Sequence, residues 1–413
     1  MKSVALVVAI AVTALVQGPP QKFVPDPVQP SDLKVRLDLV GAMPSHTNPT
    51  SPAVAGSSLL LIDQAGALFV WNDTRADLLL SKANLPAGVK LMGYESFLNV
   101  AANKAGTTVY VMFISSSVPK DVPKHQSPHA ESTSWYLLYA FDFDGANLTR
   151  PRPIVALQER WDGHSGGGMT VLPDDSVLFA AGDNGDSYED GGVNAQDSTN
   201  HLAKIVQIDP ATGAIKVVAI GVRACQRLAI DAFDGDVRLS LVDPGGWVSE
   251  ELNSVRLADL AGSTPLDFGW GRATSDGRSR EGTFYIDRTG NSTARAPLNE
   301  PGFIQPVAEF GREKATQVAV SGPVHSTTSF QTIAFLFGDL VSGAVYAVTG
   351  PPSTLHQPVL AVSLVDSQGQ PVTLKALAKA QRGDPRFFTF PDGGAGVLLE
   401  ATGQFFRLTE VPR

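Results

Sequence analysis

Residues 161–213 read WDGHSGGGMTVLPDDSVLFAAGDNGDSYEDGGVNAQDSTNHLAKIVQIDPATG, and this stretch decides the fold. It contains three apolar runs of strand length, Met169–Leu172, Val177–Ala181 and Leu202–Ile208. Turn-forming residues follow the first run at positions 173–175 and the third run at positions 209–213. Short apolar runs separated by Pro, Asp and Gly are typical of antiparallel strands joined by tight turns.

A single histidine, His164, opens this stretch on a glycine-rich run, and an acidic loop follows the second apolar run. The acidic residues of this loop are Asp183, Asp186, Glu189, Asp190 and Asp197. A histidine can serve as a base near neutral pH, and carboxylates can hold a hard cation such as calcium. The loop lacks the closing Glu of an EF-hand. The same residues also fit a surface histidine and solvated turns, so the stretch alone leaves both interpretations open.

The composition favours a large all-β fold. The chain of 413 residues contains 39 Gly and 29 Pro, and it has no long amphipathic helical run. Many short strands joined by turns are typical of a sandwich, a barrel or a propeller. Further strand-length runs precede and follow the central stretch, among them Ser58–Ile62, Ala67–Trp71, Thr107–Ile114, Trp135–Phe143, Ile215–Ile220, Ala344–Val348, Ala395–Leu399 and Gln404–Leu408. We therefore expect one all-β domain over residues 36–413.

The N-terminus and the charge restrict location and partners. Residues 1–18 resemble a signal peptide, because Lys2 precedes the apolar run Val4–Val16, which is too short to span a bilayer. Residues 19–35 form a Pro-rich leader, so we expect a secreted or periplasmic protein. The formal net charge of −9 and the lack of a basic stripe argue against nucleic acid and anionic membranes as partners. Cys225 is the only cysteine, so no intrachain disulfide can form.

Several motifs resemble one known family. His164-Ser-Gly-Gly-Gly-Met, followed by Pro173-Asp174 and Gly182-Asp183, resembles the soluble quinoprotein sugar dehydrogenases, also called the glucose/sorbosone dehydrogenase family. The segments 194–197 and 202–209 resemble the next part of that family's pattern. This resemblance implies a six-bladed β-propeller, pyrroloquinoline quinone (PQQ) and calcium as cofactors, and His164 as the catalytic base.

The resemblance also assigns cofactor contacts. The segment 221–226 is similar to the family's G-x-R-N-P-Q, which implies that Arg223 and Gln226 contact the quinone. Gly245 and Gly246 stand where family members hold calcium through backbone carbonyls. Arg382 and Arg386 loosely represent the family's C-terminal cofactor clamp. A tricarboxylate quinone needs several fixed cations, because guanidinium groups bind carboxylates bidentately.

Other positions depart from the family pattern. Tyr94 replaces a pocket glutamine, Gly163 stands where an aspartate often precedes the histidine, Ala224 replaces an asparagine, and Phe268 replaces a tyrosine. Three functions therefore remain open. The first is an exported aldose dehydrogenase that uses a small sugar and a soluble electron acceptor. The second is a non-catalytic propeller that binds carbohydrate or protein. The third, a calcium-dependent lactonase, ranks last because no cluster of Glu, Asn and Asp ligands is recognisable.

Overall fold

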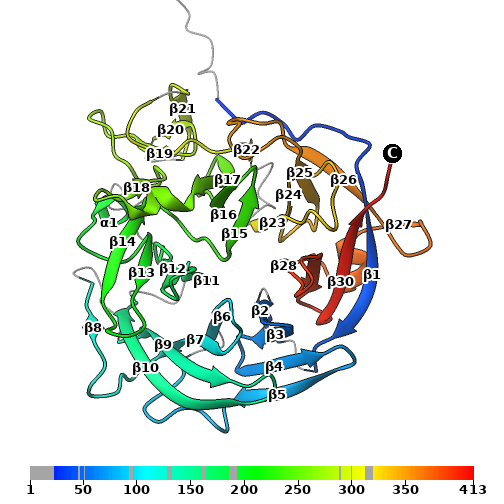
Figure 1. Cartoon of the computed structure of the whole chain (residues 1–413). Helices are drawn as coiled ribbons and strands as arrows, with labels where there is room; N and C mark the ends of the chain where they lie inside the picture. The colour runs from blue at the N-terminus through cyan, green and yellow to red at the C-terminus, as the bar shows by residue number, and fades with distance from the viewer. Residues whose placement is uncertain are drawn as a thin grey trace, which may run out of the picture.

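The computed structural model describes residues 23–44, 47–50, 52–92, 96–127, 133–159, 164–185, 193–287, 290–298, 300–311 and 320–413. Nearly all regular structure in these residues is β-strand, and the strands form six antiparallel blades around a central axis (Figure 1). This arrangement confirms the predicted six-bladed β-propeller. The helical segments of the described residues are short: α1 (Val193–Gln196), α2 (Leu374–Ala378) and a 3₁₀ turn over Leu257–Ala261.

In each of the first three blades, the four main antiparallel strands follow one another along the chain. Blade 1 contains β2 (Ala53–Ala55), β3 (Ser58–Asp63), β4 (Ala67–Asn72) and β5 (Arg75–Ser81). Blade 2 contains β6 (Phe97–Ala102), β7 (Thr108–Ser115), β9 (Trp135–Phe143) and β10 (Leu148–Gln158), with the short β8 (Lys124–His125) parallel to β10. Blade 3 contains β11 (Gly166–Val171), β12 (Val177–Ala181), β13 (Lys204–Ile208) and β14 (Ile215–Ile220), with β18 (Leu266–Asp267) parallel to β14.

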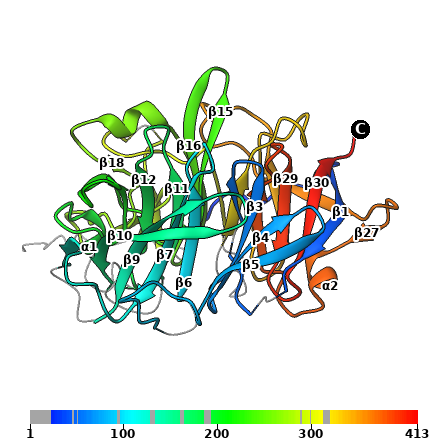
Figure 2. The same ribbon diagram turned by 60° about the horizontal axis from the view of Figure 1, so that its bottom comes forward.

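The last three blades are more elaborate. Blade 4 contains β15 (Leu228–Phe233), β16 (Asp236–Pro244), β17 (Ser249–Arg256) and β22 (Ala308–Gly311). A small sheet of β19 (Ser279–Glu281), β20 (Phe284–Ile286) and β21 (Ser292–Arg295) comes between β18 and β22 in the chain. Blade 5 contains β23 (Val320–Val324), β24 (Phe335–Asp339), β25 (Val345–Val348) and β26 (Leu360–Val365), with β27 (Pro371–Val372) beside β26. Figure 2 shows β15 and β16 extending beyond the other blades at one end of the propeller.

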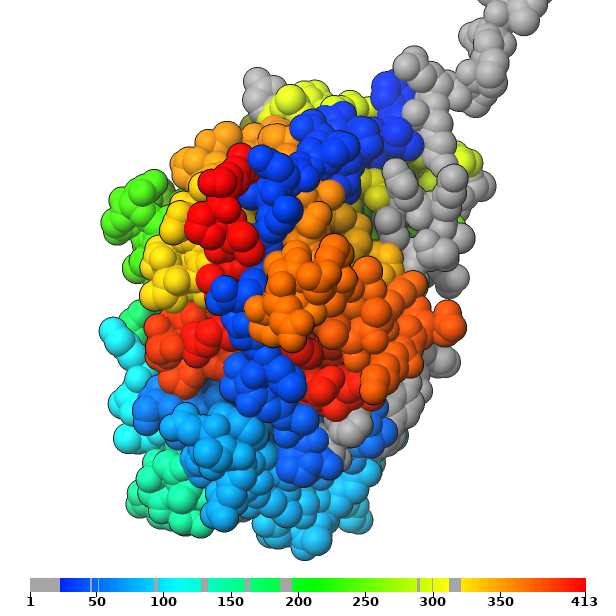
Figure 3. Space-filling view, turned by 90° about the vertical axis from the view of Figure 1, so that its right-hand side faces the viewer, coloured from blue at the N-terminus to red at the C-terminus, as the bar shows by residue number. Residues whose placement is uncertain are grey.

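Blade 6 closes the ring with strands from both ends of the chain. It contains β28 (Pro385–Thr389), β29 (Ala395–Leu399), β30 (Gln404–Glu410) and β1 (Lys34–Ala42). Strand β1 is antiparallel to β30, with Leu37 opposite Leu408, and its first residues also pair in parallel with β26. Figure 3 shows this N-terminal segment lying along the C-terminal segments. Because β1 begins at Lys34, the propeller starts inside the range that the sequence assigned to the leader.

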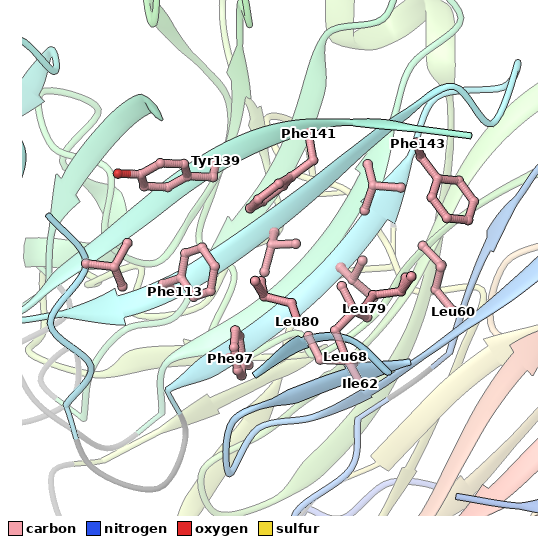
Figure 4. Packing of buried hydrophobic residues seen from close by; sticks show 14 of the residues in the cluster. Leu60, Ile62, Leu68, Leu79, Leu80, Phe97, Phe113, Tyr139, Phe141 and Phe143 are labelled. Atoms are coloured by element: carbon pink, nitrogen blue, oxygen red, sulfur yellow. The ribbon is translucent and has the colours of Figure 1, made fainter. Parts of the chain in front are cut away.

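The core consists of apolar layers between neighbouring blades. The layer between blades 1 and 2 packs Leu60, Ile62 and Leu80 against Phe113 and Tyr139 (Figure 4). Both faces of a blade meet a neighbour, so an inner strand is apolar at successive positions instead of at every second one. Strand β12 follows this rule, because all five of its residues are buried. This explains why the sequence marks the strands by apolar runs.

Several elements predicted from the sequence are present in the described part of the chain. The predicted hairpin over 58–71 is present as β3 and β4, and the three runs of the central stretch are present as β11, β12 and β13. Cys225 is buried and free. The expected signal peptide lies outside the described residues. Within the described part of the chain, no helix is long and apolar enough to cross a membrane.

Replacing Phe113 by Ala should destabilise the propeller strongly. The ring is fully buried and lies 5.1 Å from the Phe97 ring and 5.8 Å from the Tyr139 ring. Loss of a buried phenylalanine costs about 3–5 kcal/mol, because a cavity remains where the ring was. Chemical denaturation followed by circular dichroism measures the change. Leu78→Ala is the control, because Leu78 is 56% exposed. Equal midpoints for the two variants would contradict the packing described here.

Candidate active site

His164 lies just before β11 with both ring nitrogens engaged. Its Nδ1 is 3.1 Å from Oδ1 of Asp183, and its Nε2 is 3.2 Å from Nη2 of Arg223. A guanidinium group can only donate hydrogen bonds. Nε2 must therefore be the acceptor. Nδ1 then carries the proton and donates a hydrogen bond to Asp183. This tautomer leaves an unprotonated Nε2 on a side chain that is 44% exposed, which is the arrangement of a base.

The backbone brings His164 and Asp183 together through a glycine. Gly182 follows β12, and its N–H donates to the carbonyl of Ser165 at 3.0 Å. A Cβ at Gly182 would lie only 1.6 Å from the carbonyl oxygen of His164, so no other residue fits this crossing without displacing the backbone. Next in the chain, the N–H of Asp183 donates to the carbonyl of Arg223 at 2.7 Å. The pairing of β11 with β12 in blade 3 thus brings His164 and Asp183 side by side, next to Arg223.

Arg223 is held in place by its backbone and its side chain. The backbone N–H groups of Arg223 and Ala224 donate to the carboxylate of Asp243 at 2.7 and 2.9 Å. The guanidinium lies 5.2 Å from the centre of the Trp270 ring, and its Nη1 donates to the carbonyl of Pro244 at 3.2 Å. A cation over an indole face is electrostatically favourable.

Trp270 completes a group of four side chains that we call the His164 cluster: His164, Asp183, Arg223 and Trp270. The indole Nε1 of Trp270 donates to Oδ2 of Asp183 at 3.1 Å. Asp183 is only 3% exposed, and Arg223 Nε lies 3.9 Å from its Oδ2. Asp183 therefore orients the histidine, the indole and the guanidinium at once. In the sequence, the acidic loop indicates Asp183 as a possible cation ligand, and its position directly after Gly182 is the signal for the orienting role found in the structure.

The remaining predicted cofactor residues have polar or acidic partners. Gln226 and Arg386 meet, because Nη1 of Arg386 donates to Oε1 of Gln226 at 3.0 Å. Arg386 also pairs with Glu400 at 2.6 Å. Arg382 instead pairs with Asp384 at 2.8 Å, and its side chain is 50% exposed. Gln226 lines a cavity of about 220 Å³ bounded by residues of the first strands of five blades, β2, β6, β11, β15 and β28, and Arg386 lies on β28.

All three predicted cofactor arginines already have carboxylate partners. Arg223 lies near Asp183, Arg382 pairs with Asp384, and Arg386 pairs with Glu400. An anionic cofactor would have to compete with these carboxylates for the arginines, which reduces the free energy gained on binding. Calcium would add positive charge to a set of arginines that already have carboxylate partners. The donor set therefore fits a polyanionic cofactor best when a cation accompanies it.

Gly245 and Gly246 form the tight turn between β16 and β17. A Cβ at Gly245 would lie 1.7 Å from the Ser249 carbonyl oxygen, and one at Gly246 would lie 2.8 Å from the Trp270 ring. The buried carboxylate of Glu281 accepts the backbone N–H groups of Trp247, Val248 and Ser249 at 2.5–3.0 Å. Both glycines are thus required by the turn, apart from any role in binding.

Calcium at this turn would have to use backbone oxygens. Among the described residues, no group of three or more His, Cys, Asp and Glu side chains is arranged to hold a metal ion. Calcium readily takes backbone carbonyl oxygens as ligands. The carbonyl of Pro244 accepts from Arg223, so the turn presents at least one carbonyl to the His164 cluster. The turn therefore fits calcium only together with oxygen atoms of a bound cofactor.

Several residues that the sequence suggested for the site either lie outside the described residues or have another role. Tyr94, Gly163, Asp186, Glu189 and Asp190 lie outside the described residues. Asp197 accepts the N–H and the hydroxyl of Thr199, which is ordinary local turn chemistry.

A row of buried carboxyl groups crosses blade 4 behind the cluster. Asp243 lies opposite Glu251, and Glu251 lies opposite Glu309, on strands β16, β17 and β22. Burial raises the pKa of Asp243 to about 6 and raises the pKa of Glu251 and of Glu309 above their usual value. The nearby charges of Glu309 and Asp243 raise the pKa of Glu251 further. No sequence motif indicates this row, because it depends on strand register.

The comparisons with solved structures agree with this architecture. The PQQ-bound aldose sugar dehydrogenase of Streptomyces coelicolor is 17% identical, with a TM-score of 0.60 over 92% of this chain and 99% of that chain. A glucose dehydrogenase-like oxidoreductase of Thermus thermophilus is 16% identical, with a TM-score of 0.57 over 91% and 99%. The chain has the fold of these sugar dehydrogenases.

A fungal protein is similar at lower identity. The holo PQQ domain of pyranose dehydrogenase from Coprinopsis cinerea is 11% identical, with a TM-score of 0.54 over 95% of this chain and 98% of that chain. The sequence itself matches no family model and no curated protein. At these identities the likeness establishes the fold alone, and function has to be argued from the site.

Glu251→Gln should flatten the dependence of stability on pH. Because its pKa is raised, the folded protein holds this proton at pH values where the unfolded chain has lost it. The contribution of Glu251 to the free energy of unfolding is therefore fully present below the unfolded pKa of 4.5 and is lost as pH rises through the folded pKa. Glutamine carries no ionisable proton, so the variant does not lose this stability as pH rises.

Thermal unfolding at several values from about pH 5 to about pH 8 measures the effect. Glu251→Gln should gain melting temperature relative to the wild type toward the alkaline end. The control is Asp234→Asn at the exposed turn between β15 and β16, which should run parallel to the wild type. A Glu251→Gln curve parallel to the wild type would contradict protonation of this carboxyl group in the folded state.

Proposed function

We propose that this chain is a PQQ- and calcium-dependent sugar dehydrogenase that oxidises aldoses at the anomeric carbon. The observation that carries the proposal is the unprotonated Nε2 of His164, fixed by the bond from Nδ1 to Asp183 and adjacent to a guanidinium. A base beside a cation is the arrangement needed to remove a hydroxyl proton while an anionic acceptor is held nearby. The shared fold supports the choice of chemistry.

His164 is the general base of this proposal. Its Nε2 takes the proton of the anomeric hydroxyl, and the imidazolium that forms keeps its Nδ1–H on Asp183. The buried carboxylate stabilises the positive charge as it develops and holds the ring in one orientation. A bound quinone would supply the acceptor for the hydride of the anomeric carbon, and calcium beside it would supply a Lewis acid.

Arg223 links cofactor binding to the availability of the base. Without a ligand its Nη2 donates to Nε2 of His164, which is the position that a substrate hydroxyl needs. A cofactor carboxylate forms stronger hydrogen bonds with a guanidinium than a neutral imidazole does. Cofactor binding would therefore draw Arg223 from His164 and free Nε2 for the sugar. Gln226 and Arg386 are the further cofactor contacts, and the Gly245–Gly246 turn is the calcium site.

Export and redox partner complete the proposal. The apolar run Val4–Val16 after Lys2 supports secretion or a periplasmic location. A soluble electron acceptor would be the redox partner.

A non-catalytic propeller that binds carbohydrate or protein is the second candidate. The side chain of Phe268 is buried in an apolar cluster, and Ala224 is 6% exposed, so neither supplies the polar group of the family pattern. Titration of the purified protein with PQQ and calcium decides between the two candidates. Cofactor absorbance and dye reduction with aldoses support the dehydrogenase. No quinone binding at micromolar concentration would favour the non-catalytic propeller.

His164→Ala should lower the turnover number by roughly two to four decades, which is the usual contribution of a general base. Quinone affinity should change little, because His164 supports the cofactor only through Arg223. Dye reduction measures turnover, and quinone absorbance measures binding. A His164→Ala variant with wild-type turnover would mean that another residue is the base.

Arg223→Ala should mainly weaken quinone binding, in contrast to His164→Ala, which should mainly lower turnover. Loss of a charge-assisted contact of about 1.5–3 kcal/mol weakens quinone binding by roughly a decade or more. Equilibrium titration with the quinone measures this change. Arg75→Ala is a matched control, since Arg75 is exposed on blade 1 and its side chain is 76% accessible. If Arg223→Ala binds quinone as tightly as the control does, Arg223 is not a cofactor contact.

A further inference from the structure

We propose that Tyr136 is a positioning residue for the base, because its hydroxyl group holds the loop of His164 against the loop of Asp183. Tyr136 lies on β9 of blade 2, and its side chain is completely buried. The sequence motifs do not assign any role to this residue. The inference deepens the proposed function and rests on it for the role of His164 as a base.

The ring of Tyr136 is anchored between two neighbouring blades. It packs in the apolar layer between blades 2 and 3, which lie side by side in the ring of blades (Figure 1). Its centre is 5.1 Å from that of the Phe179 ring on β12, and the two ring planes are at 63°. Such edge-to-face contacts between aromatic rings are favourable. Because packing fixes the ring, its hydroxyl group has a defined position next to blade 3.

The hydroxyl group of Tyr136 contacts both ends of the β11–β12 hairpin. Its Oη donates to the carbonyl of Ser165 at 3.1 Å and accepts from Nδ2 of Asn184 at 3.0 Å. Ser165 directly follows His164, and Asn184 directly follows Asp183. Burial raises the pKa of Tyr136 well above its usual value, so the hydroxyl group keeps the proton that it donates. One oxygen atom therefore joins the two loops.

The backbone of these loops needs such support. His164 and Asn184 both have a φ of 52°, in the left-handed region that residues with a side chain seldom adopt. A conformation of this kind persists only where surrounding contacts hold it. The Ser165 carbonyl also accepts from the N–H of Gly182 at 3.0 Å, and the Ser165 hydroxyl donates to Glu159 at 2.9 Å. Ser165 is thus the point at which the His164 loop is fastened.

The relative position of the two loops decides which ring nitrogen of His164 is the base. The bond from Nδ1 to Asp183, at 3.1 Å, keeps the proton on Nδ1 and leaves Nε2 as an acceptor. Without the Tyr136 hydroxyl, the Ser165 carbonyl loses a donor and the Asn184 amide loses an acceptor. The two loops can then separate, and the proton can move to Nε2. Because an Nε2 that carries a proton cannot accept another, Tyr136 acts on the reaction through His164.

The test compares Tyr136→Phe, which removes only the hydroxyl group, with Tyr139→Phe. Tyr139 is a matched control, because it lies on the same strand, is 1% exposed and donates to the carbonyl of Ala87 at 3.0 Å. Ring ¹⁵N NMR of the protein without quinone, at about pH 8 where an ordinary histidine is neutral, reports the tautomer of His164. His164→Ala identifies its signals.

The wild type and Tyr139→Phe should show the Nδ1–H tautomer of His164. In Tyr136→Phe, roughly a tenth of the molecules or more should carry the proton on Nε2, since a buried hydrogen bond is lost. An unchanged tautomer in Tyr136→Phe overturns the inference, whatever the activity.

A second measurement follows turnover in the protein loaded with PQQ and calcium. In Tyr136→Phe the kcat for glucose should fall about 3- to 10-fold, the range expected for one lost hydrogen bond, while Tyr139→Phe keeps the wild-type kcat. The KM for glucose should change much less than kcat, because the hydroxyl group is proposed to act only through His164.

The two measurements separate this inference from the proposed function. If the wild type oxidises no sugar, the proposed function fails, yet a changed tautomer in Tyr136→Phe alone still supports the positioning of His164. Equal losses of kcat in Tyr136→Phe and Tyr139→Phe, or a changed tautomer with wild-type kcat, would overturn the role of Tyr136 in the reaction.

Discussion

The pairing of β1 with β30 is the contact on which the rest of the structure depends. It joins the two ends of the chain in blade 6, with Leu37 opposite Leu408. An open ring of blades would expose the edge of its last sheet, and free strand edges are prone to pair with other chains. Closure also gives each blade two neighbours, so both of its faces can be buried. The loops of one end of the propeller converge only because the ring is closed.

The His164 cluster is a consequence of this convergence. His164 and Asp183 come from the two ends of the β11–β12 hairpin, Arg223 comes from the connection to blade 4, and Trp270 follows β18. Asp183 reaches all three of the other side chains because Gly182 lets the backbone pass close to His164. The absence of a side chain at Gly182 thus allows the base, the guanidinium and the indole to meet around Asp183.

Charge is distributed unevenly around this cluster. The carboxyl row of Asp243, Glu251 and Glu309 lies in blade 4, where burial raises each pKa and favours the neutral form. The predicted cofactor arginines have carboxyl partners, such as Glu400 beside Arg386. The site therefore offers many hydrogen-bond donors with little net positive charge. In the proposed function, this balance is the physical reason for a cation beside a polyanionic cofactor.

The sequence by itself determined the fold class and several members of the site. Apolar runs such as Val177–Ala181 predict strands, because strands buried on both faces need apolar residues at successive positions. The family resemblance brought His164, Arg223, Gln226 and Arg386 into consideration, and the first two do meet through a hydrogen bond. Only the tertiary structure decided that Asp183 orients the histidine, that Arg382 pairs with Asp384, and that Asp243, Glu251 and Glu309 form one buried row. These facts depend on the register of strands and on contacts between distant turns, and a linear pattern carries no information on either.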